Sequence, residues 1–559
     1  MFVLLKPRLT VVGVDLGTTY TSVSYYDTSR TGNIEDRIQI VSNWPAITYL
    51  GGGLKWGGAI PPNIQRHMWT KLELDAPRTG EAAKICQELL GSGYGSVAGV
   101  KRPVDIIADF LAQVLEHLIK NLNVHYTETL WQSFPLTLVV TYPAVWSDLA
   151  KALTLQAFSQ AGFNEKNLRM PRKTITATEP EAAALYTIMC IRGTAQDKQL
   201  AVGDGFVVCD MGGGTVDLIS YKVAGVDPTV LEEATIGTGD QCGGSFVERS
   251  FLRWLEEKLG EKDFREVAGG PAADISRTSL PARLSKMMQE FTGCAKSGFH
   301  GSDTEDYELR LPAPLNAIVC DTSHSIENGE ILITSEDLKE MFSYSLQKIG
   351  ELLLAQIKAA GQKGQVKVRF AFLVGGFAES QYIQMELQKL VINHGVHIIK
   401  PLHAWSAIAR GAATKGLEQG GATPIKDRKC RRKHREQESY ICYWLISEGQ
   451  DLPTAAKVHG KVSMHSNFWP GEKRHASPLL LAADIDKAPR RSHVIAVYEV
   501  ARLRVNLEQV PQRAFRKQNN SKKPYYELHY EIHISVQSGL EFSLWVDGKR
   551  YGAVAAEYA

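Results

Sequence analysis

The chain has 559 residues, of which 44% are hydrophobic and 9% aromatic, a composition typical of a well-packed globular protein with several domains. Its 63 basic and 61 acidic residues give a net charge of +2, which argues against a whole-chain electrostatic role on nucleic acid or a membrane. The eight cysteines form no C-x-x-C pair, so we expect no zinc site and reduced thiols in the cytoplasm. No stretch approaches the roughly 18 apolar residues that span a bilayer, and the N-terminus lacks a signal-peptide pattern, so we expect no membrane partner.

The first predicted element is a β-hairpin in the sequence VVGVDLGTTYTSVSYY at residues 11–26. An apolar strand ends at Asp15, and Gly17, Thr18 and Thr19 form the bend. Glycine lets backbone N–H groups approach an anion, and threonine hydroxyls add hydrogen-bond donors. A carboxylate at the same bend would repel a phosphate unless Mg²⁺ lay between them. Taken alone, the bend is either an ordinary tight turn or half of a metal–phosphate site.

The rest of the first 417 residues alternates helices and strands. A buried strand is predicted over 136–145, and FLVGGFAES predicts a strand, a Gly375-Gly376 turn and a helix. The sequence FVVCDMGGGTVDLISYKV at 206–223 repeats the strand, bend and strand of the first hairpin, so the chain has two halves that open in the same way. Helices are predicted over 104–122, 147–162, 244–259 and 335–360.

The second bend carries Asp210, three glycines and Thr215. Three consecutive glycines are costly inside a sheet, and a phosphate lying on their N–H groups would compensate. The alternative is a glycine-rich β-bulge with no ligand. Two such hairpins facing each other would clamp a polyphosphate and its metal. The chain contains no G-x-x-x-x-G-K-[ST], so the sequence excludes a P-loop enzyme.

Five motifs in a fixed order resemble the actin, sugar-kinase and heat-shock ATPase superfamily, and within it the 70-kDa heat-shock chaperones. They are GVDLGTTYTSV, VVTYPAVWSD, ATEPEAAAL, VVCDMGGGTVDL and FLVGGFAES, and the resemblance spans about residues 10–417. It implies a duplicated, actin-like, two-lobe α/β fold with a nucleotide cleft for ATP or ADP and Mg²⁺. The implied division is lobe I (1–190), lobe II (191–402), a helix returning to lobe I (403–418), a basic linker (419–439) and a small β-rich C-terminal domain (440–559).

The resemblance also implies roles for individual residues. Asp15 and Asp210 would hold Mg²⁺, mostly through its water molecules, and Glu179 would order either those metal-bound waters or the attacking water. Lys71 is the candidate for the family's phosphate-contacting lysine, with an ordinary surface lysine as the alternative. The implied catalytic residues are Asp15, Lys71, Glu179, Asp210 and Thr215. The implied nucleotide contacts are Gly17, Thr18, Thr19, Tyr20, Gly212, Gly213, Gly214, Gly243, Gly244, Lys296, Gly375, Gly376 and Phe377, and the residues implied to couple nucleotide state to domain motion are Pro143 and Lys151.

The sequence departs from the chaperones after its first two lobes and at the site for the base. Phe377-Ala378-Glu379 follows the Gly-Gly turn where the family has Ser-Thr-Arg, so a carboxylate replaces the guanidinium that stacks on adenine. Phe377 is the alternative stacking partner. The hydrophobic interdomain linker and the acidic tail are absent, and we expect the C-terminal region to lack the usual peptide-binding sandwich and lid, as in divergent fungal and animal members.

Two features are predicted in the C-terminal part. The basic run at 428–435 is a solvated linker, a nuclear signal or a weak polyanion site. YELHYEIHISV alternates apolar and polar residues with a period of two, which predicts a half-buried strand, and Asp547-Gly548 predicts a turn.

Three functions are compatible with this pattern. The leading hypothesis is a slow Mg²⁺-dependent ATPase whose nucleotide state switches the closure of its lobes and which acts on an unidentified protein client or partner. The second is a non-catalytic nucleotide-binding scaffold. The third is a small-molecule kinase of the sugar-kinase branch, supported only by the shared hairpins.

Overall fold

The chain forms two compact units, which are described separately. Unit 1 comprises Met1–Val145, Leu153–Tyr221 and Gly237–Gln419, and unit 2 comprises Trp146–Ala152, Lys222–Ile236 and Gly420–Ala559. The computed structural model describes residues 10–558 apart from 28–36, 45–46, 51–52, 58–59, 62–63, 65, 68, 76–100, 127–130, 133–135, 169–173, 193–199, 227–228, 276–279, 323, 364–365, 418–424, 430–433, 439–440, 447–450, 454–457, 484–496, 519–524 and 537–539.

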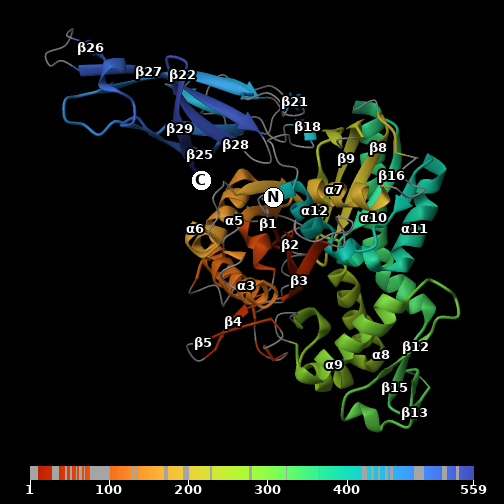
Figure 1. The fold of residues 1–559 in the computed structure, drawn as a ribbon. Coiled ribbons are helices and arrows are strands. Elements are labelled where there is room, and N and C mark those ends of the chain that lie inside the picture. Colours follow the sequence, from red (N-terminus) through yellow and green to blue (C-terminus); the bar gives the residue numbers. More distant parts are fainter. Residues whose placement is uncertain are drawn as a thin grey trace, which may run out of the picture. The chain divides into compact units, whose positions relative to one another are not determined.

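Unit 1 contains the two sheets on which lobes I and II are built. The sheet of lobe I has five strands in the order β3-β2-β1-β6-β7 (Figure 1). Its first three strands pair antiparallel, and β6 and β7 continue the sheet in parallel to β1. The strands are β1 (Thr10–Asp15), β2 (Thr21–Asp27), β3 (Ile38–Trp44), β6 (Leu136–Tyr142) and β7 (Ile175–Thr178), with a separate hairpin of β4 (Ile47–Leu50) and β5 (Gly53–Trp56). The helices are α3 (Pro103–His125), α5 (Asp148–Gln160), α6 (Glu165–Leu168), α7 (Glu179–Ile191), α12 (Ala407–Leu417) and the 3₁₀ turn η2 (Thr70–Leu74).

Lobe II repeats this arrangement. Its sheet contains the order β17-β16-β8-β9. As in lobe I, two parallel strands, here β16 and β17, extend the sheet from the first strand of a hairpin, here β8. The strands are β8 (Gly205–Met211), β9 (Val216–Gly225), β11 (Thr238–Asp240), β16 (Val368–Val374) and β17 (His397–Ile399), with a second small sheet of β12 (Tyr307–Arg310), β13 (Cys320–Asp321), β14 (Ile326–Glu327) and β15 (Glu330–Ile333). The helices are α8 (Ser245–Ala268), α9 (Ala282–Glu290), the π-helix η6 (Phe291–Lys296), α10 (Ser335–Lys363), α11 (Gln381–Val391) and the 3₁₀ turns η5 (Ala272–Asp274), η7 (Leu315–Ala317), η8 (Gly376–Glu379), η9 (Ile392–His394) and η10 (Ala404–Ser406).

Continuous apolar runs form the central strands of both sheets. Every residue of β6 and of β8 is buried, as expected for strands that are covered on both faces. In lobe I, α12 packs against α7, β1 and β6, and in lobe II, α10 packs against β8 and β16 (Figure 1). The predicted duplicated two-lobe α/β fold is confirmed.

Unit 2 is rich in strands. In one sheet β10 (Val230–Glu233) pairs in parallel with β18 (Ile425–Lys429), which pairs antiparallel with β21 (Asp451–Pro453). A ten-stranded sheet follows the order β20-β19-β24-β25-β29-β28-β27-β22, with β23 on β25 and β26 on β27. Its strands are β19 (His434–Glu438), β20 (Ile441–Ile446), β22 (Gly460–Phe468), β23 (His475–Ala476), β24 (Leu479–Ala483), β25 (Val497–Asn506), β26 (Arg516–Gln518), β27 (Tyr525–Val536), β28 (Leu540–Val546) and β29 (Lys549–Tyr558), joined in part by η11 (Gln512–Ala514).

The predicted alternation and turn near the C-terminus are confirmed. Leu528, Tyr530 and Ile532 of β27 are buried in one core, while the residues between them are exposed or half-buried. Asp547 and Gly548 join β28 to β29 with φ values of 47° and 74°. The stretch 419–439, which we expected to be a linker, contains β18 and β19. Residues 430–433 of the basic run lie outside the described residues.

Across the described part of the chain, no helix is both long enough and apolar enough to cross a bilayer.

Candidate functional site

The first hairpin bends between β1 and β2. Asp15, the last residue of β1, is 7% exposed, and its carboxylate accepts a hydrogen bond from the Thr141 hydroxyl on β6 at 3.1 Å. Glycine is required at position 17, because a Cβ there would collide with the carbonyl oxygen of Tyr20. The bend is therefore tight, and it places an acid beside three residues with hydroxyl groups.

The second hairpin bends between β8 and β9. The Gly212 N–H donates to the Thr215 carbonyl at 2.9 Å, which closes the bend. The Gly244 N–H donates to the Gly212 carbonyl at 3.1 Å, and a Cβ on Gly243 would lie 2.6 Å from the Gly213 carbonyl oxygen. Gly243 and Gly244 therefore pack against the backbone of this bend without lining the cavity.

The two bends contact each other. A Cβ on Gly213 would collide with the Thr19 hydroxyl, and a Cβ on Gly214 would lie 3.3 Å from Thr18 Cγ2. Thr19 Oγ1 is buried and has no hydrogen-bond partner among the described residues. Such an unpaired hydroxyl is costly to bury, so it is a candidate donor for a ligand at the meeting point of the hairpins.

A cavity of about 200 Å³ opens between the hairpins. This volume suits part of a nucleotide rather than all of it, since pockets for drug-sized ligands are about 300–1,000 Å³. Among the residues predicted from the sequence, Gly214, Gly243, Gly244, Lys296 and Phe377 do not line it. The lining residues are Asp15, Gly17, Thr18, Thr19, Tyr20, Thr21, Ser22, Lys71, Glu179, Asp210, Gly212, Gly213, Thr215, Gly375, Gly376, Trp405 and Ile408.

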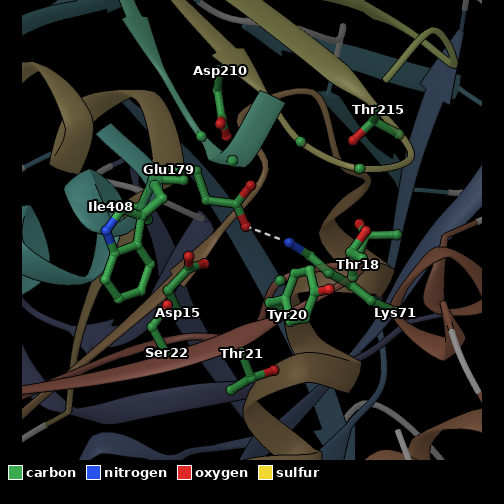
Figure 2. Close-up of a pocket in the computed structure, with 17 residues that line it drawn as sticks. Asp15, Thr18, Tyr20, Thr21, Ser22, Lys71, Glu179, Asp210, Thr215 and Ile408 are labelled. Carbon is green, nitrogen blue, oxygen red and sulfur yellow. Dashed lines mark hydrogen bonds and ion pairs between the residues drawn. The ribbon is translucent and has the colours of Figure 1, made fainter. Parts of the chain in front are cut away.

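Lys71 and Glu179 form a buried ion pair inside the cavity. Nζ of Lys71 lies 2.6 Å from Oε1 of Glu179, and each side chain is 6% exposed. Lys71 belongs to η2, and Glu179 is the first residue of α7. Figure 2 shows the lysine directed at the glutamate, with the carboxylates of Asp15 and Asp210 in the same cavity. The structure therefore places Lys71 in the cavity rather than on an open surface.

The cavity brings three carboxyl groups together around one ammonium. Burial raises the pKa of Asp15 and of Glu179, and it raises the pKa of Asp210 to about 8, with a further contribution from Asp217. Burial acts to lower the pKa of Lys71, but the nearby carboxylates outweigh it and the pKa is raised.

This charge distribution fits a divalent cation. When ionised, Asp15, Glu179 and Asp210 exceed the charge of Lys71 by two, the amount that Mg²⁺ would neutralise. Among the described residues there is no group of three or more His, Cys, Asp or Glu arranged to hold a metal. A cation between Asp15 and Asp210 would therefore take most of its ligands from water and phosphate, as Mg²⁺ commonly does.

The Gly-Gly turn lies against the second hairpin. Gly375 has φ 90°, and a Cβ there would lie 2.7 Å from Oδ1 of Asp210. Position 375 therefore needs glycine on two grounds, backbone conformation and close approach. Gly376, which follows, begins η8 and also lines the cavity.

Two residues implied to contact the nucleotide, Phe377 and Lys296, interact with other groups of the protein. Phe377 is 6% exposed and stacks on Phe342, with ring centroids 6.1 Å apart. Lys296 Nζ donates to the Gly244 carbonyl at 2.7 Å and pairs with Glu248 at 2.9 Å. Both residues lie behind the cavity wall because the interior packing of lobe II holds them.

Sequence reasoning missed Trp405 and Ile408, which line the cavity from η10 and α12. Their motif, AWSAIARGAATKG, indicated only a closing helix, and a tryptophan among small residues was the available signal. Pro143 is buried after β6, and Lys151 pairs with Asp148 at 3.3 Å. Neither Pro143 nor Lys151 lines the cavity.

Comparisons with known proteins agree with the fold. The chain matches no family model. It is 25% identical over 380 residues to human "Heat shock 70 kDa protein 12A", an alignment that covers 57% of this chain and 54% of the relative. It is 24% identical over 374 residues to human "Heat shock 70 kDa protein 12B", covering 57% and 53%. It is 23% identical over 432 residues to "Chaperone protein DnaK" of Stenotrophomonas maltophilia, covering 75% and 60%. The chain thus spans about half the length of the human relatives it matches.

Proposed function

The chain is a divergent relative of the 70-kDa heat-shock proteins, and we propose that it binds ATP or ADP with Mg²⁺ and hydrolyses ATP slowly. The observation that carries this proposal is the buried cavity in which two hairpin bends bring Asp15 and Asp210 together with Lys71 and Glu179. Phosphoryl transfer to water needs positioning and charge neutralisation, and no covalent nucleophile on the protein.

Each group has a role that its position supports. Asp15 and Asp210 would hold the Mg²⁺, which when bound would neutralise charge on the phosphates. The Thr18 and Thr19 hydroxyls and the N–H groups of both bends hold phosphate oxygens. Lys71 adds the positive charge on the phosphate side, and Glu179 orients the water that attacks.

The nucleotide also connects the lobes. Asp15, Lys71 and Glu179 come from lobe I, whereas Asp210 and Gly375 come from lobe II, and all five line one cavity. A ligand that contacts both sets stabilises the closed arrangement by its differential affinity for it. The closed and open arrangements then present different surfaces to a protein partner or client.

The test is ADP production by the purified chain with ATP and Mg²⁺, with Asp210→Asn as the inactive variant. Asp204→Asn is the matched control, because Asp204 precedes the same strand, pairs with Arg369 at 3.0 Å and does not line the cavity. We expect turnover in the wild type and in Asp204→Asn and none in Asp210→Asn. Equal turnover in the Asp210→Asn variant would refute the proposed hydrolytic site.

The direct Lys71–Glu179 pair favours a second candidate, a nucleotide-binding scaffold without hydrolysis. The pair occupies the lysine and the glutamate with each other at 2.6 Å, rather than leaving either for phosphate or water. Tight Mg²⁺-dependent ATP binding without ADP production above the Asp210→Asn level would select this alternative.

A further inference from the structure

The cavity lacks the arginine that the family places on adenine, and the residue that replaces it is a carboxylate, Glu379. We propose that Trp405 takes over as the platform on which the nucleotide base stacks. This inference rests on the proposed function, because a base reaches the cavity only as part of a nucleotide.

Trp405 has the position and the exposure that a base platform needs. It lines the cavity from η10 and is 43% exposed, so its indole is open to a planar ligand at the rim. Ile408, which also lines the cavity, lies across it from Lys71 and Thr18 in Figure 2. Trp405 and Ile408 line the cavity from η10 and α12, which follow one another in the chain, whereas the two bends proposed to hold phosphate lie on other elements. The other exposed aromatic residue of the lining, Tyr20, belongs to the bend of the first hairpin, which is proposed to hold phosphate.

The alternative platform is unsuitable. Phe377 is 6% exposed, and its ring is held between Phe342, at a centroid distance of 6.1 Å, and the ammonium of Lys296, at 5.7 Å. Opening this ring to a base would break a stacked pair inside lobe II. Trp405 offers a larger aromatic surface without that cost.

Glu379 fixes the segment that carries the tryptophan. Its Oε1 accepts a hydrogen bond from the Trp405 backbone N–H at 3.2 Å, and its Oε2 pairs with Lys400 at 2.6 Å. The Gly375 N–H donates to the Ala404 carbonyl at 2.9 Å, which ties the same segment to the Gly-Gly turn. An arginine at position 379 could accept neither hydrogen bond and would repel Lys400. The loss of the arginine and the use of Trp405 are therefore parts of one arrangement.

Stacking on an indole has a characteristic specificity. Every base has a π-face, so stacking discriminates weakly between bases. We therefore expect ATP and GTP to bind with affinities within about tenfold of each other, because the indole stacks on adenine and on guanine with similar strength. Alanine substitution of a stacking residue typically weakens binding by about 5- to 100-fold.

The experiment compares calorimetric binding of Mg²⁺–ATP and of Mg²⁺–tripolyphosphate, which has the phosphates without the base. The variants are Trp405→Ala and Trp405→Phe, and Trp469→Ala is the matched control, because Trp469 is 44% exposed and does not line the cavity. We expect Trp405→Ala to weaken ATP binding about 5- to 100-fold and to leave tripolyphosphate binding unchanged. Trp405→Phe recovers most of the ATP affinity, and Trp469→Ala changes neither ligand.

The other outcomes each overturn the inference in a distinguishable way. Unchanged ATP binding in Trp405→Ala excludes stacking on this residue. Equal loss of ATP and tripolyphosphate shows that the tryptophan supports the structure of the site instead. Wild-type protein that binds tripolyphosphate as tightly as ATP has a phosphate site without a base platform, so the proposed phosphate site stands while this inference fails. Wild-type protein that binds neither ligand refutes the proposed function and this inference with it.

Discussion

A buried ion pair away from the cavity gives the sharpest stability prediction. Nζ of Lys415 on α12 lies 2.8 Å from Oε1 of Glu181 on α7, and the side chains are 7% and 0% exposed. The same ammonium donates to the Thr176 carbonyl at 3.0 Å. Lys415→Met keeps most of the apolar stem but leaves the buried Glu181 carboxylate without the ammonium that neutralises it, with the Thr178 N–H still donating to Oε2. Breaking one side of a buried pair costs about 3–5 kcal/mol, and we expect unit 1 to lose that much unfolding free energy.

Urea unfolding followed by helical far-UV circular dichroism measures this loss. Lys389→Met is the matched control, because its pair with Glu386 is exposed by 68% and 27%, and we expect a change within about 0.5 kcal/mol. The double variant Glu181→Met/Lys415→Met removes both buried charges, so it should recover part of the loss, although it also removes the Glu181 side chain from the capping box of α7. A cost for Lys415→Met no larger than that of Lys389→Met would refute the reasoning. The Lys415–Glu181 pair bears on the cavity because Glu181 lies on α7, the helix whose first residue is Glu179.

Three further predictions concern the cavity and its surroundings. Gly375→Ala adds a Cβ 2.7 Å from Asp210 Oδ1 at φ 90°, so we expect lower stability by about 1–3 kcal/mol and loss of calorimetric Mg²⁺–ATP binding. Gly376→Ala, whose Cβ meets nothing within 4 Å, is the control for stability and should leave the unfolding free energy unchanged. Thr19→Val removes a buried hydroxyl that has no partner among the described residues, so thermal stability should not fall while ATP affinity does; a lower melting temperature would contradict this. Burial raises the pKa of Glu73 from its ordinary 4.5 to about 7, so the folded state holds more protons across this range and stability falls as the pH rises through it. Glu73→Gln should remove that loss in urea midpoints compared at about pH 5 and about pH 8, and an unchanged slope would exclude Glu73 as its source.

The parts of the structure that follow from local pattern were predictable. The two hairpins follow from an apolar strand, an acid and a glycine bend, and β27 follows from strict alternation in YELHYEIHISV. The duplicated sheets follow because the second half repeats the first. The predicted acids at positions 15, 179 and 210 all line the cavity. Asp15 ends β1, Asp210 is the penultimate residue of β8, and Glu179 begins α7 directly after β7.

The parts that depend on distant packing were not predictable. Phe377 turns into lobe II because Phe342, on α10, stacks with it, and no local pattern indicates that contact. Glu379 appeared only as a lost arginine, whereas the structure shows it holding Lys400 and the Trp405 backbone. The basic stretch looked like a linker because charge suggests solvent, yet β18 pairs with β10, a strand nearly 200 residues earlier in the chain.

The central claim is that the two hairpins hold a nucleotide through a divalent cation. The most direct test is calorimetric titration of the wild-type chain and the Asp15→Asn variant with ATP, first in Mg²⁺ and then with Mg²⁺ removed by EDTA. We expect the wild-type chain to bind ATP in Mg²⁺ and to bind it at least about tenfold more weakly in EDTA, and we expect the Asp15→Asn variant to bind weakly in both conditions. Equal wild-type affinity with and without Mg²⁺, or no ATP binding at all, would contradict the central claim.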